Sequence, residues 1–252
     1  MSEFTKDNLL ELMRKYEACK ESYDFVYSCK SIEECSEKAP FEYITWFLRK
    51  RPDLSYLVNW NRLSNIYVAY ILTELPELAI HYDLSKFDGE CWSVLLYEKP
   101  QFADKCDWSK LNGIDWKYIL QDNPNFAKYC DWSKLDGTNW SDLLIFQPQF
   151  ADKCDWSKLD GEDWFRLLIV QPQFVDKCDW SKLDGYYLSE LLLIQPQFAN
   201  KCDWSKLNGY YLSQLLAVQP QFADKCNWSK LDQLDWDYLL QFQPQFAKYR
   251  IK

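Results

Sequence analysis

A proline recurs every 24 residues through most of this chain, and this unbroken spacing limits the fold to a repeat architecture more strictly than any other feature. All six glycines and six of the ten cysteines keep the same period. A fixed period of this length is typical of arrays in which each unit packs only against its neighbours. We therefore predict an elongated solenoid. The prolines of the register are Pro52, Pro76, Pro100, Pro124, Pro148, Pro172, Pro196, Pro220 and Pro244.

The composition of the 252 residues suits such an array. Hydrophobic residues make up 48% of the chain and aromatic residues 18%, which is enough for a continuous core. Residues 1–45 do not carry the repeat, and terminal units of solenoids usually differ from internal ones because their outer face meets solvent. We therefore expect an N-terminal helical cap over residues 1–45 and a solenoid of about nine units over residues 46–252.

Three local signals indicate helices at the N-terminal end. Apolar residues fall at helical spacing within residues 7–19. The four residues from Ser31 to Glu34 have the form of a capping box. Pro40 precedes residues 41–51 and suits an early helical position. We predict one helix at each of these places.

Each 24-residue unit begins with a short amphipathic helix. Within residues 161–171, Trp164, Leu167 and Leu168 lie at i, i+3 and i+4 on one face. Pro172 ends this helix, because proline lacks an amide proton and clashes with the preceding turn, but it suits the start of a second helix. Helices this short are marginal alone in water, so neighbouring units must hold them. The unit is therefore predicted to contain two helices.

The second half of the unit is expected to fold as a short helix followed by a tight turn. Phe174 and Cys178 are four residues apart and would share one face of that helix. Trp180 and Leu183 would be buried by a single turn before the next helix. An alternative stays open, because Cys178 and Trp180 also alternate as on a strand. A strand and a helix in each unit would give a leucine-rich-repeat-like α/β solenoid.

The layout of an apolar helix, a proline-led second helix and a compact turn resembles the leucine-rich variant repeat, a superhelix of alternating short helices. The repeated wording, PQFADKCDWSKLDG in single letters, is similar to tandem 24-residue repeats of microbial proteins that have no established activity. That similarity covers roughly residues 76–250. Tryptophan and phenylalanine stand where the leucine-rich variant repeat has leucine and valine. The resemblance therefore implies an all-α architecture and no particular function.

Charge and apolar content narrow the setting in which the chain works. A formal net charge of −9 argues against direct nucleic-acid binding, which needs a basic surface to displace counterions. Acids and bases alternate within residues 151–160, which is typical of a solvated face. The longest apolar runs are too short to span a bilayer, and the first residues have no basic segment followed by an apolar one. No membrane association is expected.

Cysteine usage indicates a reducing compartment. Equivalent side chains in stacked helical units lie about 8–10 Å apart, too far for a disulfide. We therefore expect buried free thiols and a cytoplasmic protein. A disulfide between Cys29 and Cys35 is the one pairing that stays open. The six repeated cysteines are Cys106, Cys130, Cys154, Cys178, Cys202 and Cys226.

No catalytic residue, cofactor site or metal site is predicted. His81 is the single histidine, and a lone histidine is most often a surface or packing residue. Cysteines 24 residues apart do not converge on one zinc ion, and each glycine stands alone rather than in a phosphate-binding loop. Asp-Trp pairs recur in the units, which favours a structural role such as helix capping. We therefore expect a protein that is not an enzyme.

The residues that vary between units indicate the candidate site. On a helical wheel, the two positions before Trp164 and the positions two, five and six after it lie opposite the core. Their equivalents are mostly polar in early units and become apolar or aromatic over residues 138–242. We call these residues the apolar strip and predict that they bind a partner. They are Ile145, Phe146, Ile169, Val170, Tyr186, Tyr187, Leu193, Ile194, Tyr210, Tyr211, Val218 and Phe242.

Two explanations of the apolar strip are open from the sequence. Its side chains are either buried between layers of the solenoid or exposed as a surface for a protein partner or for self-association. The second explanation favours a non-enzymatic scaffold whose partner protein the sequence does not identify. The alternative function is an acidic decoy or inhibitor, for example a phage-borne one. Such a decoy would mimic a nucleic-acid backbone and block a nucleic-acid-binding or host-defence protein.

Overall fold

The computed structural model describes residues 4–250, and within that range it contains helices, turns and loops but no strand. Helices recur in regular pairs, and successive α-helices of the repeats pack against one another. The all-α solenoid prediction is confirmed, and the leucine-rich-repeat-like α/β alternative is wrong. The chain divides into two compact units, Met1–Leu111 and Asn112–Lys252, which are described one at a time.

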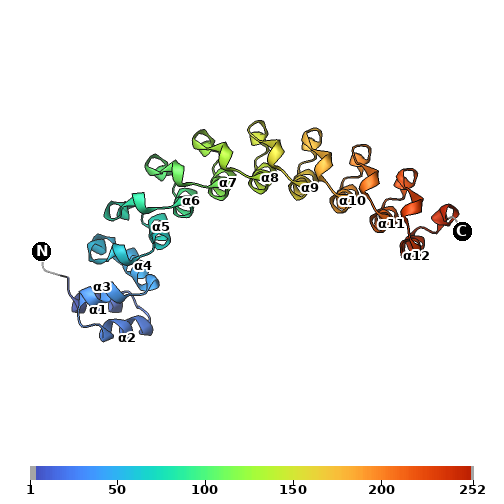
Figure 1. Cartoon of the computed structure of the whole chain (residues 1–252). Coiled ribbons are helices and arrows are strands. Elements are labelled where there is room, and N and C mark those ends of the chain that lie inside the picture. The colour runs from blue at the N-terminus through green and yellow to red at the C-terminus, as the bar shows by residue number, and fades with distance from the viewer. Residues whose placement is uncertain (1–3, 251–252) are drawn as a thin grey trace. The chain divides into compact units, whose positions relative to one another are not determined.

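The first unit contains the non-repeating helices and the first repeats (Figure 1). Its described α-helices are α1 (Lys6–Lys15), α2 (Lys20–Ser28), α3 (Ile32–Lys38), α4 (Phe41–Lys50), α5 (Asn65–Glu74) and α6 (Gly89–Glu98). Leu9, Met13, Val26 and Cys35 belong to one buried apolar cluster that joins α1, α2 and α3. The helices predicted near residues 7–19, 31–34 and 41–51 are present as α1, α3 and α4, whereas α2 was not predicted. The division at residues 45 and 46 stays a prediction.

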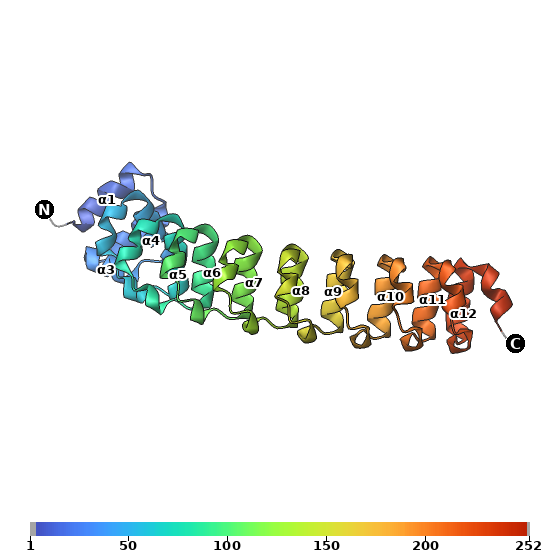
Figure 2. The same cartoon turned by 90° about the horizontal axis from the view of Figure 1, so that it is seen from above.

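The second unit is a row of equivalent ten-residue helices, as Figure 2 shows from above. Each packs against the next one along the chain. Asp160 caps the helix that follows it by accepting a hydrogen bond from the Asp163 amide at 2.9 Å, and Asp184 does the same for the Tyr187 amide. The helices are α7 (Gly113–Asp122), α8 (Gly137–Phe146), α9 (Gly161–Val170), α10 (Gly185–Ile194), α11 (Gly209–Val218) and α12 (Gln233–Phe242).

The proline-led segment of each repeat is a 3-10 helix and not the predicted α-helix. In one repeat the Phe174 amide donates to the Gln171 carbonyl at 3.2 Å, three residues back. Five or six residues between a proline and the next turn are too few for stable α-helical hydrogen bonding. Cys178 lies just after the end of this segment. The segments are η1 (Pro52–Leu57), η3 (Pro76–His81), η5 (Pro100–Lys105), η7 (Pro124–Tyr129), η9 (Pro148–Asp152), η11 (Pro172–Lys177), η13 (Pro196–Asn200), η15 (Pro220–Lys225) and η17 (Pro244–Tyr249).

A second, three-residue 3-10 helix supplies the tight turn after each proline-led segment except η17, the last described one. Asp179 stabilises one of these turns by accepting a hydrogen bond from the Ser181 amide at 3.1 Å, so the Asp-Trp pairs have the structural role expected of them. The turns are η2 (Trp60–Arg62), η4 (Leu84–Lys86), η6 (Trp108–Lys110), η8 (Trp132–Lys134), η10 (Trp156–Lys158), η12 (Trp180–Lys182), η14 (Trp204–Lys206) and η16 (Trp228–Lys230).

The core of the repeats combines leucines with two kinds of tryptophan. Trp164, Leu167 and Leu168 are fully buried, as predicted for the first helix. Leu183 is also fully buried, but Trp180 is only half-buried, so the prediction for the turn is wrong for the tryptophan. The turn tryptophans pack across units instead. Trp156, for example, stacks on Trp164 with ring centroids 5.4 Å apart and also contacts Phe174 at 5.4 Å.

Lysine bridges join consecutive repeats through the backbone. The Lys158 ammonium donates to the carbonyls of Ser133 at 2.8 Å and Leu135 at 2.6 Å, in the preceding repeat. Lys206 binds the carbonyls of Ser181 and Leu183, both at 2.7 Å, in the same way. The last lysine of residues 151–160 is therefore part of the framework and not of a purely solvated face.

Glycine at the first helix position allows the turn that ends the same repeat to approach the helix start closely. A Cβ atom at Gly185 would lie 2.4 Å from the Lys206 carbonyl oxygen, and one at Gly161 would lie 2.5 Å from that of Lys182. Both distances are shorter than any normal contact. The equivalent residue of α12 is Gln233, and within residues 4–250 no turn equivalent to that of Lys206 follows it. The glycine register is thus explained by close backbone packing between neighbours.

Candidate functional site

The apolar strip projects from the outer face of α8 to α12. In each ten-residue helix the core takes positions four, seven and eight, which in α9 are Trp164, Leu167 and Leu168. Positions nine and ten then point away from the core, because each residue advances about 100° around a helix. In α9 these positions are Ile169, which is half-buried, and Val170, which is exposed. The same alternation holds in the neighbouring helices.

No residue of the apolar strip is buried. Phe146 is 66% exposed, Ile194 is 52% exposed and Tyr210 is 59% exposed. The strip residues at position nine and the second tyrosine of each pair are half-buried. Burial between layers of the solenoid therefore does not account for these side chains. Partner binding by them stays a prediction.

Glutamine bridges hold the backbone beneath the strip. The Gln171 side-chain amide donates to the Ile145 carbonyl at 2.7 Å, and that of Gln243 donates to the Ala217 carbonyl at 2.8 Å. These carbonyls belong to the last turn of the preceding helix, where no intrahelical donor is available. The ends of α8, α9, α10 and α11, which carry strip residues, are thus each fixed by the following repeat.

The helix position immediately before the tryptophan was predicted to lie on the exposed face, and this prediction is wrong. Asp163 is 4% exposed and accepts a hydrogen bond from the Ser141 hydroxyl of the preceding repeat at 3.1 Å. Burial raises the pKa of its carboxyl group above the ordinary value. The position therefore contacts the neighbouring helix. Tyr187 and Tyr211, which occupy it in the next two helices, are half-buried for the same reason.

These tyrosines form a continuous aromatic row over α9, α10 and α11. Phe165 contacts Tyr187 with ring centroids 5.6 Å apart, and Tyr187 contacts Tyr186 at 5.2 Å. Tyr186 in turn contacts Tyr211 at 6.3 Å, and Tyr211 contacts Tyr210 at 5.5 Å. Ring pairs at such distances and tilted angles attract one another beyond their simple burial. These ring contacts hold the tyrosine side chains in place in the middle of the strip.

Charged side chains lie on the same face, near the middle of the helices. The Asp142 carboxylate pairs with the Lys117 ammonium at 3.2 Å and also with the Arg166 guanidinium. Glu190 occupies the position of Arg166 in the next repeat, and no cation pairs with it among residues 4–250. It lines a groove of about 400 Å³ between α10 and α11, together with Tyr186 and Tyr210. Sequence reasoning missed Glu190, although the alternation of Asp142, Arg166 and Glu190 at equal spacing was a usable signal.

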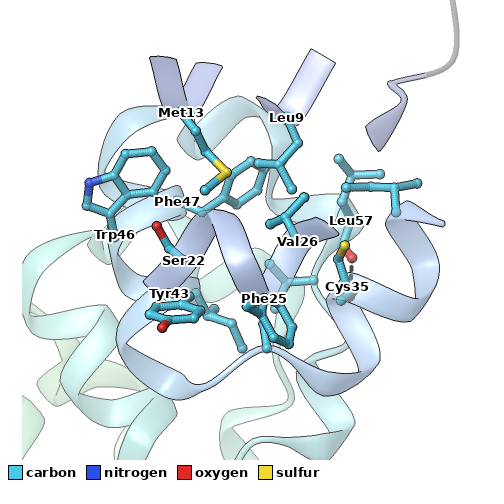
Figure 3. Close-up of a pocket in the computed structure, with 15 residues that line it drawn as sticks. Leu9, Met13, Ser22, Phe25, Val26, Cys35, Tyr43, Trp46, Phe47 and Leu57 are labelled. Atoms are coloured by element: carbon cyan, nitrogen blue, oxygen red, sulfur yellow. Dashed lines mark hydrogen bonds between the residues drawn. The ribbon is translucent and has the colours of Figure 1, made fainter. Parts of the chain in front are cut away.

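A separate apolar cavity lies inside the first unit. Figure 3 shows Met13, Phe25, Val26 and Phe47 around it, on α1, α2 and α4. Its volume of about 70 Å³ is less than half that of an apolar cavity of about 150 Å³ that accepts benzene. The Ser22 hydroxyl at its wall already donates to the Cys19 carbonyl at 2.7 Å. The cavity suits a few apolar atoms rather than a cofactor.

His81 is paired with a serine that the sequence reasoning did not single out. The His81 Nε2 atom lies 2.9 Å from the Ser55 hydroxyl oxygen, and the imidazole stacks on Trp60 with centroids 6.1 Å apart. Ser55 is only 2% exposed, so its hydroxyl is closed to a substrate. The pair packs η1 against η3, and this arrangement fits a structural histidine.

The cysteines are free thiols, including Cys29 and Cys35. Burial raises the pKa of the repeated cysteines to about 12, as for Cys178 and Cys202. The expectation of fully buried repeat thiols is wrong in degree, since these six are half-buried. Within residues 4–250, no cluster of three or more potential metal ligands occurs, and no helix has the length and apolarity to cross a membrane.

No protein-family model, curated protein or solved structure matches this chain. The resemblance to tandem repeats of microbial proteins therefore stays a prediction, and the functional argument depends on the surface alone.

Proposed function

We propose that this protein is a non-enzymatic repeat scaffold that binds a protein partner through the apolar strip. One observation carries the proposal: position ten of five successive helices holds an exposed apolar side chain. Exposed apolar residues that occur singly need no explanation, but a regular row of them is typical of a protein-binding surface. The members of this row are Phe146, Val170, Ile194, Val218 and Phe242.

The geometry beneath the row favours tight binding. Lysine and glutamine bridges fix each repeat to the next, so the row loses little conformational freedom when a partner binds. Burying one exposed phenylalanine or isoleucine stabilises a complex by about 1.5–3 kcal/mol. The tyrosine row adds rigid aromatic contacts of the kind that dominate interface energies. We therefore place most of the partner contacts on residues 138–242.

An affinity pull-down from a lysate of the native host tests this proposal. The test variant carries Phe146→Lys, Tyr187→Lys and Ile194→Lys, which place ammonium groups in the strip. The control variant carries Asn200→Lys and Asp224→Lys, which add the same positive charge at exposed positions of η13 and its successor η15. We expect the test variant to lose a protein that the wild type and the control retain. Equal retention by all three folded proteins would refute the strip as the binding surface.

The acidic decoy is the weaker proposal. Asp155 and Asp179 accept hydrogen bonds from the serine hydroxyls two residues later, both at 2.6 Å, and these bonds lower the pKa of each carboxyl group. The repeated acids thus serve the turns of the framework, which favours the scaffold. Partner binding that falls steeply with salt would support the decoy instead. We also assign the protein to the cytoplasm, because its cysteines are free thiols.

A further inference from the structure

We infer that the groove between α10 and α11 binds an arginine side chain of the partner protein, with its guanidinium group paired to Glu190. This inference rests on the proposed scaffold function and names the chemistry that the partner must present. The groove is lined by Tyr186, Glu190, Leu193, Tyr210, Gln214 and Val218, among others.

Within the described part of the chain, the Glu190 carboxylate has no cationic partner on this face. On the same face one repeat earlier, Arg166 pairs with Asp142, which Lys117 also binds. Arg166 lies between Asp142 and Glu190 in the register, and it is committed to Asp142. Glu190 is half-buried and has no cationic partner among residues 4–250. A carboxylate in such a groove gains most from a cation that the partner supplies.

Tyrosine rings form one wall of the groove. Tyr186 and Tyr211 contact each other with ring centroids 6.3 Å apart and planes tilted by 56°, and Tyr210 stands against Tyr211 at 5.5 Å. Tyrosine faces attract cations, and a planar guanidinium stacks on them while it also bonds a carboxylate in a bidentate manner. Lysine offers a compact ammonium without that planar match. The combination of rings and a carboxylate therefore selects arginine.

The groove also has an apolar edge. Leu193 and Val218 line it beside the charged group. The methylene stem of an arginine packs on such apolar surface while its head reaches a polar group. Gln214 adds a side-chain amide oxygen as a second acceptor for guanidinium N–H groups. A chain with a net charge of −9 also attracts a basic partner over distance.

The inference is tested by NMR titration of the full-length ¹⁵N-labelled chain with N-acetyl-L-arginine amide. We expect amide shifts to concentrate on α10 and α11, and Glu190→Gln to weaken binding at least tenfold. Glu90→Gln, the same change at an exposed position of α6, should leave binding unchanged. Tyr210→Leu keeps the carboxylate but removes a ring, and it should weaken binding several-fold. The unchanged spectrum of each free variant outside the substituted region checks its folding.

Two further probes complete the test, one without charge and one with an ammonium group in place of the guanidinium. N-acetyl-L-citrulline amide has nearly the shape of the arginine probe without its charge, and it should not bind. Equal binding of citrulline, equal binding of N-acetyl-L-lysine amide, or no effect of Glu190→Gln would each overturn the arginine assignment.

The outcomes separate this inference from the proposed function. A pull-down partner that depends on the strip but is retained fully by Glu190→Gln would leave the scaffold standing and refute the arginine groove. Arginine-probe binding at α10 and α11 without any strip-dependent partner would support the arginine-binding groove and refute the scaffold function.

Discussion

The ammonium group of Lys182 donates a hydrogen bond to the backbone carbonyl of Ser157, one repeat earlier, across 2.6 Å. A second bond reaches the Leu159 carbonyl at 2.5 Å. Carbonyls of a turn that faces the next repeat would otherwise lack protein donors. Lys182 resembles an ordinary surface charge in the sequence, but it forms one of the lysine bridges between repeats.

Lys182→Met tests how much this lysine bridge contributes to the free energy of unfolding. The substitution keeps most of the aliphatic stem but leaves the partly buried Leu159 carbonyl and the exposed Ser157 carbonyl without their donor. Because one of the two groups is partly buried, the loss should lower the free energy of unfolding by about 1–3 kcal/mol. Urea denaturation followed by tryptophan fluorescence measures the change. Lys177→Met, at an exposed lysine of the same repeat, serves as the control and should stay within about 0.5 kcal/mol of wild type. Similar losses in both variants would contradict the bridging role.

Gly185→Ala should destabilise the array, although alanine is normally favoured over glycine within a helix. The added methyl group would meet the Lys206 carbonyl oxygen at 2.4 Å, and backbone cannot move aside as a flexible side chain can. Overpacking of this kind costs about 1–3 kcal/mol. Gln233→Ala is the matched substitution at the same helix position of the last repeat, where it should be nearly neutral. Thermal unfolding that ranks the two variants in the opposite order would refute the close-approach explanation.

Stability should fall on the acid side because of the repeated turn aspartates. Hydrogen bonds from the serines two residues on lower the pKa of Asp155, Asp179 and Asp203 in the folded protein. The folded state therefore binds fewer protons than the unfolded state, so the stabilisation is complete above the unfolded pKa of about 4. It is lost as the pH falls through the lowered folded values. Melting temperatures recorded from neutral to acid pH measure this loss.

Asparagine provides the control for the acid prediction, because one repeat already carries it. Asn227 accepts the same bonds, from the Ser229 amide at 3.2 Å and the Ser229 hydroxyl at 2.7 Å, without a titrating group. The combined variant Asp155→Asn, Asp179→Asn and Asp203→Asn should fold and lose less stability on acidification. An acid limb as steep as that of the wild type would show that other groups control it.

Thiol labelling should divide the cysteines into one fast residue and a slow majority. Cys19 is exposed, whereas burial holds the pKa of thiols such as Cys130 and Cys178 at about 12. At about pH 8 such a thiol has on the order of 10⁻⁴ of its population as the reactive thiolate. Iodoacetamide followed by mass spectrometry should modify Cys19 first, and Cys19→Ser should abolish the fast phase. Rapid labelling of several repeat cysteines in the folded protein would count against this burial.

The same thiols should make stability decline at alkaline pH, which melting temperatures recorded from neutral to alkaline pH measure. Their folded pKa lies above the unfolded value of about 8.5, so the folded state keeps protons that the unfolded state releases. This contribution is fully present below the unfolded value and declines as the pH rises toward about 12.

Local signals explain why much of the fold was predictable. The first helix was expected over residues 161–171 and is observed as α9, Gly161–Val170. Asp160 caps its start and Pro172 prevents its continuation, and both effects depend only on residues next to the helix ends. The helical period placed the strip opposite the core of its own helix, but whether its side chains are exposed or buried between layers was open from the sequence.

Contacts between repeats were not predictable, because one partner is usually the backbone. The carbonyls that Lys182 and Gln171 bind are 23 to 26 residues away and have no side-chain signature. The burial of Asp163 depends on the close approach of Gly137 in the preceding helix, which a single helical wheel does not represent. The equal spacing of Asp142, Arg166 and Glu190 is visible in the sequence, but the pairing of Arg166 with Asp142, which leaves Glu190 without a cation among residues 4–250, is visible only in the structure.

Because the lysine bridges between repeats are equivalent, genetic recombination can change the length of the array by whole repeats. Removing residues 161–184 would bring Lys206 to the carbonyls of Ser157 and Leu159 in place of Ser181 and Leu183, which are the same residue types. Unequal recombination between such similar segments would therefore yield a shorter or longer protein whose every junction is already compatible. Reach along a target could then evolve by copy number, while the identity of the target is tuned by the few side chains that differ between copies.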